Sequence, residues 1–216
     1  MSCHSRFESS AEACHDAWTV WLTGFSGSGK STLGRGLATH LNALSIDCEL
    51  IDGDEVRQDL CKDLGFSKHD RDENVRRIGY VVRLLSRHKI VSIVAAISPY
   101  RATRDEIRKK IRRFFEIHVD CSLPVLAKRD VKGLYKRAFA GEIENFSGVS
   151  GPYEPPLSPD LYLNTGLQSE EECLALIISK IQDVGWLAPM QLPQAALTTA
   201  DNGFSSAPFR NLEPTW

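Results

Sequence analysis

The stretch that decides the fold is Trp18-Thr-Val-Trp-Leu-Thr-Gly-Phe-Ser-Gly-Ser-Gly-Lys-Ser-Thr-Leu-Gly-Arg-Gly36, an apolar run that leads into a glycine-rich turn. Within it, Gly24, Gly29, Lys30 and Ser31 match the phosphate-binding P-loop pattern G-x-x-x-x-G-K-[ST]. Glycines there let successive backbone N–H groups converge on phosphate oxygens, and the lysine adds a positive charge. The leucines that follow recur at helical spacing, at Leu33, Leu37, Leu41 and Leu44. The stretch therefore predicts a strand, a P-loop and a helix in succession.

The P-loop supplies candidates for binding the phosphates of a nucleoside triphosphate. They are Gly24, Ser26, Gly27, Ser28, Gly29, Lys30, Ser31 and Thr32. The hydroxyl of Ser31 can ligate Mg²⁺, which we expect as the cofactor that accompanies ATP. The alternative, an unrelated flexible glycine loop, is disfavoured because the turn lies between a strand pattern and a helix pattern.

The composition describes an ordinary globular chain of 216 residues, with 42% hydrophobic and 25% charged residues, which favours one domain. Lys and Arg total 26 against 28 Asp and Glu, so no overall positive charge would attract nucleic acid or a membrane surface. No apolar run reaches membrane-spanning length, and the beginning lacks a secretory signal pattern. The six cysteines contain no C-x-x-C pair and the six histidines no metal-binding spacing. We expect a cytoplasmic protein with reduced thiols.

Strand and helix patterns alternate along the chain. Strand patterns occur at 18–22, 47–51, 90–97, 114–119 and 161–164, and helix patterns at 55–64, from 72 onward, and at 101–113, 123–129 and 170–184. The last helix pattern carries a capping box, Ser169 with Glu172, and a stripe of Leu174, Ile177, Ile181 and Val184. This alternation predicts an α/β fold of the P-loop kinase type, a doubly wound parallel sheet flanked by helices.

Composition also suggests how the chain is divided. Residues 1–17 are polar and without periodicity, which predicts a flexible leader. Residues 18–187 form the predicted domain, and residues 188–216, with four prolines and three charged side chains, a disordered tail without assigned function. Residues 130–160 mix aromatic, basic, Gly and Pro residues, which is typical of a mobile lid.

Two carboxylates, Asp52 and Asp54, follow the second strand pattern directly. Ligands of an open α/β sheet bind at the carboxyl ends of its strands, so both should lie near the P-loop. If the segment stays extended, the spacing of two places both side chains on one face. The alternative for each is an Asp that caps the following helix.

Seven basic residues fall between Arg101 and Arg113, which could suggest a nucleic-acid surface. A solvated helix face that also carries Asp105 and Glu106 is the favoured interpretation. Arg101 and Arg104 stand close enough to the preceding strand end to reach a ligand.

The motifs taken in order resemble the adenylylsulfate kinase family over residues 18–187. The matching runs are the P-loop, Asp52-Gly-Asp-Glu-Val-Arg57, Leu64-Gly-Phe-Ser67, Asp70-Arg-Asp-Glu-Asn-Val-Arg-Arg-Ile-Gly79, Ile97-Ser-Pro-Tyr-Arg101, and Lys132-Gly-Leu-Tyr-Lys136 with Ala140-Gly-Glu-Ile143. The resemblance implies transfer of a phosphoryl group from MgATP to the 3′-hydroxyl of adenosine 5′-phosphosulfate (APS). The products would be 3′-phosphoadenosine 5′-phosphosulfate and ADP, in sulfate activation. It also implies a homodimer and a functional link to ATP sulfurylase.

The resemblance also implies site residues. Asp54 would accept the hydroxyl proton, Lys30 would neutralise phosphate charge, and Asp52 would order water bound to Mg²⁺. Acceptor-binding positions carried over from the family are Asp54, Arg57, Phe66, Arg71, Asn74, Ile97, Ser98, Lys132 and Phe146. Arginine forks suit tetrahedral oxyanions, and Phe66 with Phe146 would sandwich the acceptor adenine. Ordinary core packing is a stronger alternative for Phe66 than for Phe146. Arg129 and Thr165 are candidates for binding the ATP base.

Ser98 occupies a position that the family pattern associates with a phosphoserine intermediate. Direct in-line transfer is the favoured alternative, because no base for Ser98 is evident nearby and Asp54 with a bound hydroxyl suffices. The chain also departs from the family pattern at Glu55, Gln58 and Asp59, and at two positions of the predicted lid that are usually basic, Phe139 and Glu144. These departures put catalytic efficiency in doubt more than the identity of the reaction.

Other functions remain open from the sequence. A GTPase would carry an N-K-x-D motif, and a motor ATPase a D-E pair after the strand at 90–97; neither is present. The remaining alternatives are a related P-loop kinase that acts on another small hydroxyl compound, such as a sugar acid, and a non-catalytic nucleotide-binding subunit. Intact Lys30, Ser31 and Asp54 argue against the latter.

Overall fold

The computed structural model describes residues 17–188. A five-stranded, all-parallel sheet forms the centre, in the order β2-β3-β1-β4-β5. The strands are β1 (Thr19–Thr23), β2 (Cys48–Asp52), β3 (Val91–Ala95), β4 (Phe114–Asp120) and β5 (Leu161–Asn164). All five strands predicted from the sequence are present. Every residue of β1 and β3 is buried, as expected for central strands covered on both faces.

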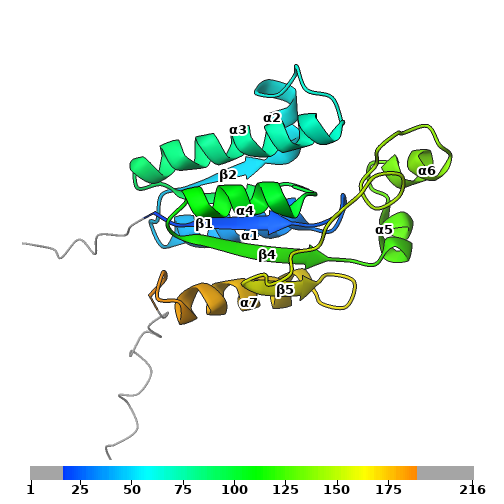
Figure 1. The fold of residues 1–216 in the computed structure, drawn as a ribbon. Coiled ribbons are helices and arrows are strands. Elements are labelled where there is room, and N and C mark those ends of the chain that lie inside the picture. The colour runs from blue at the N-terminus through cyan, green and yellow to red at the C-terminus, as the bar shows by residue number, and fades with distance from the viewer. Residues whose placement is uncertain (1–16, 189–216) are drawn as a thin grey trace, which may run out of the picture.

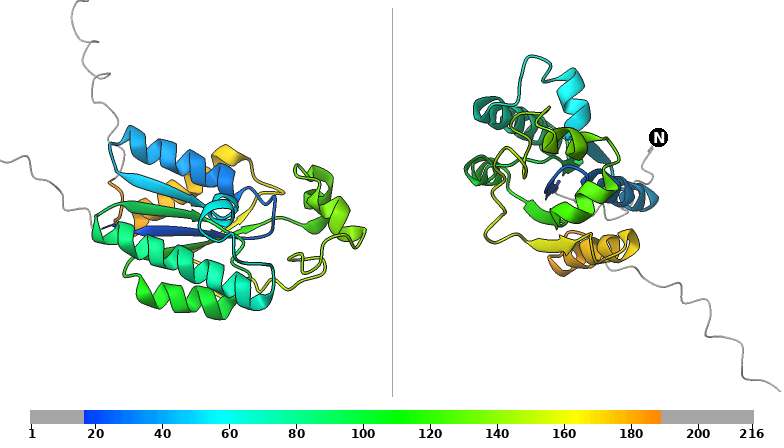
Figure 2. Two further views of the ribbon diagram at one scale, coloured as in Figure 1. Left: turned by 90° about the horizontal axis from the view of Figure 1, so that it is seen from above. Right: turned by 90° about the vertical axis from the view of Figure 1, so that its right-hand side faces the viewer.

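Helices cover both faces of the sheet, so the predicted doubly wound fold is confirmed (Figures 1 and 2). On one face, α1 (Lys30–Ala43) and α7 (Glu170–Asp183) pack around Leu37 and Ile177. On the other, α3 (Lys68–Arg87) and α4 (Arg101–Lys110) pack around Ile78 and Ile107. The remaining helices, α2 (Gly53–Asp59), α5 (Leu123–Arg129) and α6 (Leu134–Phe139), lie toward the carboxyl ends of the strands.

Several helix boundaries differ from the sequence expectations. α3 begins at Lys68 rather than near Asp72, because Ser67 caps it by accepting a hydrogen bond from the Asp70 amide. α4 ends at Lys110 rather than at 113. The capping box of Ser169 and Glu172 is confirmed at the start of α7.

One expected core position is wrong. Val184 is 46% exposed because it is the residue at which α7 ends. Leu44, which continues the helical spacing of α1, is likewise 44% exposed because α1 ends at Ala43. Helical spacing predicts burial only within the helix itself. The buried residues of α7 are Cys173, Ile177 and Ile181.

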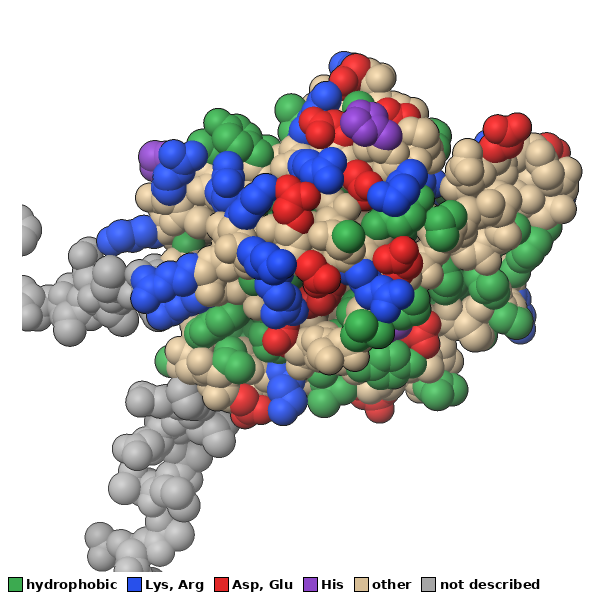
Figure 3. Space-filling view, viewed as in Figure 1, with side chains coloured by type: hydrophobic (Ala, Val, Ile, Leu, Met, Phe, Trp, Pro, Cys, Tyr) green, Lys and Arg blue, Asp and Glu red, His purple; other side chains and the backbone are tan. Residues whose placement is uncertain are grey.

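Apart from the buried Arg104, the basic residues of α4 lie on a solvated surface, as predicted. Figure 3 shows acidic side chains among the blue Lys and Arg side chains of the α3 and α4 face. Glu106 pairs with Arg76 and Lys110, and Arg108 pairs with Asp160. A nucleic-acid surface would need uncompensated positive charge, so these pairings favour the structural interpretation.

Two sequence predictions fall mainly outside the described residues. Of the predicted leader (1–17) and tail (188–216), the structure describes only Ala17 and Ala188.

Within residues 17–188, no helix has the length and apolarity required to cross a membrane. Cys48, Cys61, Cys121 and Cys173 are free thiols.

Candidate active site

The P-loop is a tight turn between β1 and α1. A Cβ added to Gly24 would lie only 2.1 Å from the Val119 carbonyl oxygen, so no other residue fits there without moving the backbone of β4. Gly29, at the first position before α1, has a φ of 95°, a left-handed value that favours glycine. The glycines therefore fix the turn that aims the N-terminus of α1 at an anion.

Lys30 is buried, and its Nζ donates a hydrogen bond of 2.6 Å to the Phe25 carbonyl oxygen. Burial lowers the pKa of Lys30 to about 8, while the nearby carboxylates of Asp54 and Asp52 act in the opposite direction. The P-loop lysine and both predicted carboxylates thus lie within electrostatic reach of one another. The sheet order explains this, because β3 alone separates β1 from β2.

The segment does not stay extended after Asp52, so the spacing of two does not place Asp52 and Asp54 on one face. The helix α2 begins at Gly53, and Asp52 caps it by accepting a 2.9 Å hydrogen bond from the Asp54 amide. The alternative role weighed for Asp52, a helix cap, is therefore present. Asp54 is exposed in the first turn of α2.

Residues 130–160, the segment predicted as a lid, contact the P-loop side of the site. Lys132 forms an ion pair with Asp54. The hydroxyl of Tyr135, a buried residue of α6, donates a 2.8 Å hydrogen bond to the Ser26 carbonyl oxygen. Burial raises the pKa of the Tyr135 hydroxyl, so it stays a donor at neutral pH. Sequence reasoning missed Tyr135, because no local pattern links a residue to a partner 109 positions away.

Arg129 and Thr165, the candidates for the ATP base, lie together beside the P-loop. Arg129 Nη2 donates to the Thr165 carbonyl oxygen at 2.5 Å. The Thr165 hydroxyl in turn donates to the Ser28 carbonyl oxygen at 2.9 Å. This chain of contacts connects α5, the end of β5 and the P-loop at the predicted donor side.

The two predicted acceptor arginines lie over the ring of Phe66. The guanidinium carbons of Arg57 and Arg71 lie 4.8 Å and 5.4 Å from the centre of the Phe66 ring. Arg57 also donates a 2.6 Å hydrogen bond to the Gly65 carbonyl oxygen, and Arg71 Nη2 one of 2.6 Å to Asn145. Burial lowers the pKa of both guanidinium groups. Arginine starts from so high an ordinary pKa that both groups remain cationic. The contact with Asn145 brings the 130–160 segment to the arginine pair.

The expectation that core packing explains Phe66 better than Phe146 is wrong. Phe66 is 59% exposed, whereas Phe146 is 8% exposed and packs edge-on against Tyr135, with ring centres 5.1 Å apart. Phe66 lies in the loop before α3, where Arg57 and Arg71 contact its ring. In this structure the two rings therefore pack against different partners rather than against each other.

The turn after β3 contains two further predicted residues. The Ile97 carbonyl oxygen accepts a 2.7 Å hydrogen bond from the Thr23 hydroxyl. The buried Ser98 hydroxyl accepts from Trp21 Nε1 at 3.0 Å and donates to the Ala96 carbonyl oxygen at 3.3 Å. Ser98 is thus already bonded within the protein, which supports the interpretation without a phosphoserine. Arg104 is buried and bonded to protein groups, so the expectation that it reaches a ligand is wrong.

Asn74 differs from these residues because its Oδ1 is buried and has no hydrogen-bond partner. Buried polar atoms normally find a partner, so an unpaired amide oxygen on α3 is an expected feature of a ligand-binding position. Asn74 lies one turn after Arg71 on the same helix, which places it on the acceptor side.

The oxygen donors present fit Mg²⁺. Ser31 stands at the start of α1, and the carboxylates of Asp52 and Asp54 lie near the P-loop lysine. Hydroxyl and carboxylate oxygens are the ligands that Mg²⁺ prefers, with waters and substrate phosphates completing the shell. Among residues 17–188, no cluster of three His, Cys, Asp or Glu side chains that could hold a metal ion is present.

The fold and this arrangement define a P-loop kinase. The family model for adenylylsulphate kinase matches residues 16–164. The chain is 53% identical over 169 residues to the adenylyl-sulfate kinase of Synechococcus sp. (strain JA-3-3Ab), covering 78% of this chain and 96% of that protein. This chain belongs to the adenylylsulfate kinase family.

Solved structures agree with this assignment. The APS kinase of Mycobacterium tuberculosis in complex with AMPPNP and APS superposes with a TM-score of 0.74 at 40% identity, covering 77% of this chain and 98% of that one. A further relative by sequence, named "Probable bifunctional SAT/APS kinase 2" of Sorangium cellulosum, is 50% identical over 190 residues. These residues are 88% of this chain but only 32% of that protein. A gluconokinase from Sinorhizobium meliloti, at 19% identity and a TM-score of 0.51, shares the fold alone.

Proposed function

We propose that this chain transfers the γ-phosphoryl group of MgATP to the 3′-hydroxyl of adenosine 5′-phosphosulfate. The observation that carries the proposal is the group of three charges at the strand ends, Lys30 of the P-loop, Asp54 of α2 and Lys132. Phosphoryl transfer requires mainly positioning and charge neutralisation, and this group supplies a base between two cations.

Each half of the site has its own binding groups. The P-loop amides and Lys30 would hold the phosphates of ATP, and Arg129 with Thr165 would border its base. Arg57, Arg71 and Asn74 would bind the phosphosulfate and ribose of the acceptor, with the Phe66 ring as a stacking surface. Asp54 would then take the proton of the 3′-hydroxyl as it attacks the γ-phosphorus in line.

Mg²⁺, when bound, neutralises developing charge on the phosphate oxygens. Ser31 would hold it directly and Asp52 through water. Asp52 can serve this role while it caps α2, because a carboxylate has two oxygens that each accept more than one hydrogen bond.

The moving part of the predicted lid would be shorter than 130–160. Glu154 and Asp160 are bonded to Pro99, Arg101 and Glu116 in the body of the domain. Residues 130–150, which hold Lys132 and Tyr135, are therefore the part that would close over both nucleotides and exclude water. Homodimer formation, a functional link to a sulfurylase and a cytoplasmic location stay predictions; the bifunctional relative motivates the second.

The test is substrate choice. Purified protein with MgATP is offered adenosine 5′-phosphosulfate, AMP or gluconate, and ADP release is measured. The proposal predicts release that depends on the sulfated nucleotide, with AMP poor and gluconate inactive. Release with gluconate alone would favour the sugar-acid kinase alternative, and release independent of any acceptor would contradict a kinase function.

A further inference from the structure

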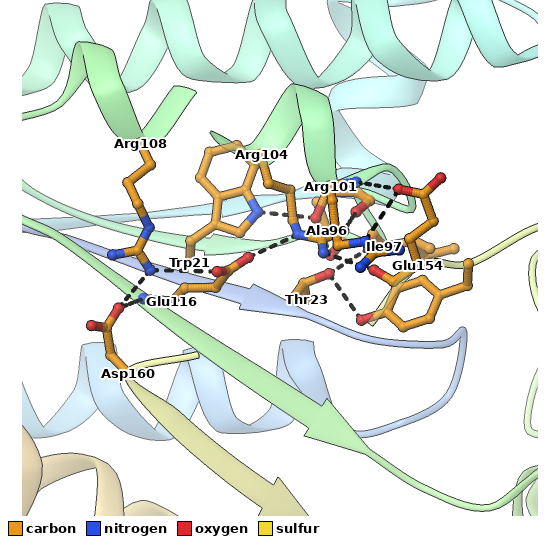
Figure 4. Close-up of polar contacts among 12 residues, drawn as sticks. Trp21, Thr23, Ala96, Ile97, Arg101, Arg104, Arg108, Glu116, Glu154 and Asp160 are labelled. Atoms are coloured by element: carbon orange, nitrogen blue, oxygen red, sulfur yellow. Dashed lines mark hydrogen bonds and ion pairs between the residues drawn. The ribbon is translucent and has the colours of Figure 1, made fainter. Parts of the chain in front are cut away.

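One arginine, Arg104 of α4, is almost fully buried although it lies outside the P-loop and the predicted acceptor residues. It is 2% exposed, and its Nε donates a 2.8 Å hydrogen bond to Glu116 of β4, which is 5% exposed. Its two terminal nitrogens donate to backbone carbonyls, at 2.6 Å to Ser98 and at 2.7 Å to Glu154. One side chain thus joins β4, the turn after β3 and the extended end of the 130–160 segment (Figure 4).

The turn that Arg104 holds has an unusual backbone. Ser98 has a φ of +39°, a left-handed value that non-glycine residues seldom adopt. Such a conformation persists only where the surroundings impose it. Here Glu154 adds a second restraint, since its amide donates to the Pro99 carbonyl oxygen at 2.8 Å and its carboxylate accepts from the Arg101 amide at 2.9 Å.

This turn lies where the two halves of the site meet. β3 runs between β2, which leads to Asp54, and β1, which leads to the P-loop. A Cβ added to Gly53 would lie 3.3 Å from the Ala95 carbonyl oxygen and from Ala96, so the start of α2 rests directly on the end of β3. A shift of the turn would therefore move both the predicted acceptor contacts at Ile97 and Ser98 and the base Asp54.

We propose that Arg104 is a positioning residue for the phosphoryl acceptor, which acts by holding the Ser98 and Glu154 carbonyls and so the backbone of residues 96–98. The proposal rests on the proposed function, because it assigns that turn to the acceptor half. Arg104 does not touch substrate. The guanidinium group suits this task because its donors are spread over three nitrogens of a rigid plane, and each nitrogen bonds a different partner here. The three donors of a lysine all lie on one nitrogen and cannot reproduce this geometry.

The structure provides a matched control in Arg108, one turn further along α4. Arg108 Nη2 contacts the same Glu116, at 3.4 Å, and Asp160 at 2.7 Å. Its partners do not include Ser98 or Glu154. A variant at Arg108 removes a cation from the same network but leaves the turn bonded.

Kinetics separate positioning from a general structural role. In Arg104→Lys, which keeps a cation beside Glu116, we expect kcat/KM for the acceptor to fall by about a hundredfold, as a misplaced reaction centre does. The dissociation constant for the ATP analogue AMPPNP should stay within about twofold. Arg108→Met should keep kcat/KM for the acceptor near that of the parent protein. The proposal would be overturned if Arg104→Lys weakened AMPPNP binding as much as it lowered kcat/KM for the acceptor. It would also be overturned if Arg108→Met lowered kcat/KM for the acceptor as much as Arg104→Lys does.

A second measurement does not depend on turnover. Because Trp21 Nε1 donates to the Ser98 hydroxyl, the indole N–H resonance of Trp21 reports the turn directly. In Arg104→Lys this resonance should shift and exchange with solvent at least tenfold faster, whereas Arg108→Met should leave it unchanged. An unchanged resonance would overturn the proposal even if activity falls. If the parent protein does not phosphorylate adenosine 5′-phosphosulfate, the proposed function fails, and the resonance still decides whether Arg104 holds the turn.

Discussion

Lys132 and Asp54, which are 78 residues apart in the sequence, form an ion pair across the candidate active site. The pair joins the 130–160 segment to the first turn of α2. Both side chains are more than half exposed, so the contact adds little to stability, typically about 0–1 kcal/mol for exposed pairs. Its significance is geometric, because it brings a cation to the carboxylate that we assign as the base.

Asp54→Asn should abolish most turnover while it preserves donor binding. The amide is similar in shape but cannot accept the hydroxyl proton, so we expect kcat to fall by about 10²–10⁴-fold. The dissociation constant for AMPPNP should change little, since the P-loop is untouched. Glu55→Gln, which removes the next carboxylate of α2, is the matched control and should be nearly silent. Undiminished kcat in Asp54→Asn would remove this residue from its role.

Lys132→Met tests whether the 130–160 segment contributes charge to the reaction. We expect a fall in kcat of about tenfold or more, because a cation near the transferred phosphoryl group is lost. Thermal stability should be unchanged, because the ion pair is exposed. Lys136→Met removes a nearby exposed lysine of α6 and serves as the control. Equal activity of the two variants would contradict a specific role for Lys132.

We expect Lys30 to take up a proton when ATP binds near pH 8. Burial lowers its pKa to about 8, so about half of the molecules carry a neutral lysine at that pH. The phosphates favour the charged form, and binding should take up as much as about half a proton. Calorimetry in two buffers of different ionisation enthalpy measures this uptake. Lys30→Arg, which stays charged, should show none; uptake equal to that of the parent protein would contradict the assignment.

The lowered pKa of Lys30 also predicts how the stability of the protein without ATP depends on pH. The pKa of Lys30 is lower in the folded state than the ordinary value of 10.5, so the unfolded chain binds more protons between about pH 8 and 10.5. The contribution of Lys30 to the free energy of unfolding should therefore rise with pH across that window. Chemical denaturation of the parent protein and of Lys30→Met at pH 8 and pH 10 compares the slopes. A larger gain with pH in Lys30→Met would contradict the direction.

Phe66 and Phe146 should respond differently to truncation. Phe66→Ala removes an exposed ring and should raise the acceptor KM by about tenfold or more with little change in melting temperature, since stacking on a base is worth about 1–3 kcal/mol. Phe146→Ala empties a buried position, so besides any effect on the acceptor KM it should lower the free energy of unfolding by about 3–5 kcal/mol. Phe139→Ala, at an equally exposed ring, is the control for the first variant. An unchanged acceptor KM in Phe66→Ala would exclude stacking there.

The sequence was sufficient for the elements with strong local signals. The P-loop spacing placed Lys30 at the start of α1, and the pair Ser169 and Glu172 located the start of α7. Local signals were weaker at element ends. Asp52 could end a strand or cap a helix by its sequence context, and the structure shows that it does both, as the last residue of β2 and the cap of α2.

The contacts that complete the site are long-range, so no local pattern could reveal them. The hydrogen bond from Tyr135 to Ser26 and the burial of Arg104 depend on where separate strands end. The wrong expectation for Phe66 has the same origin, since exposure is set by how the loop before α3 is covered rather than by residue type.

The products of one reaction decide whether the chain phosphorylates adenosine 5′-phosphosulfate. Purified protein is incubated with MgATP and adenosine 5′-phosphosulfate, and the nucleotides are separated and quantified. We expect ADP and a 3′-phosphorylated, still sulfated nucleotide in equal amounts, both absent when either substrate is withheld. Failure to form that product, or ADP formation at the same rate without the acceptor, would contradict the proposed function.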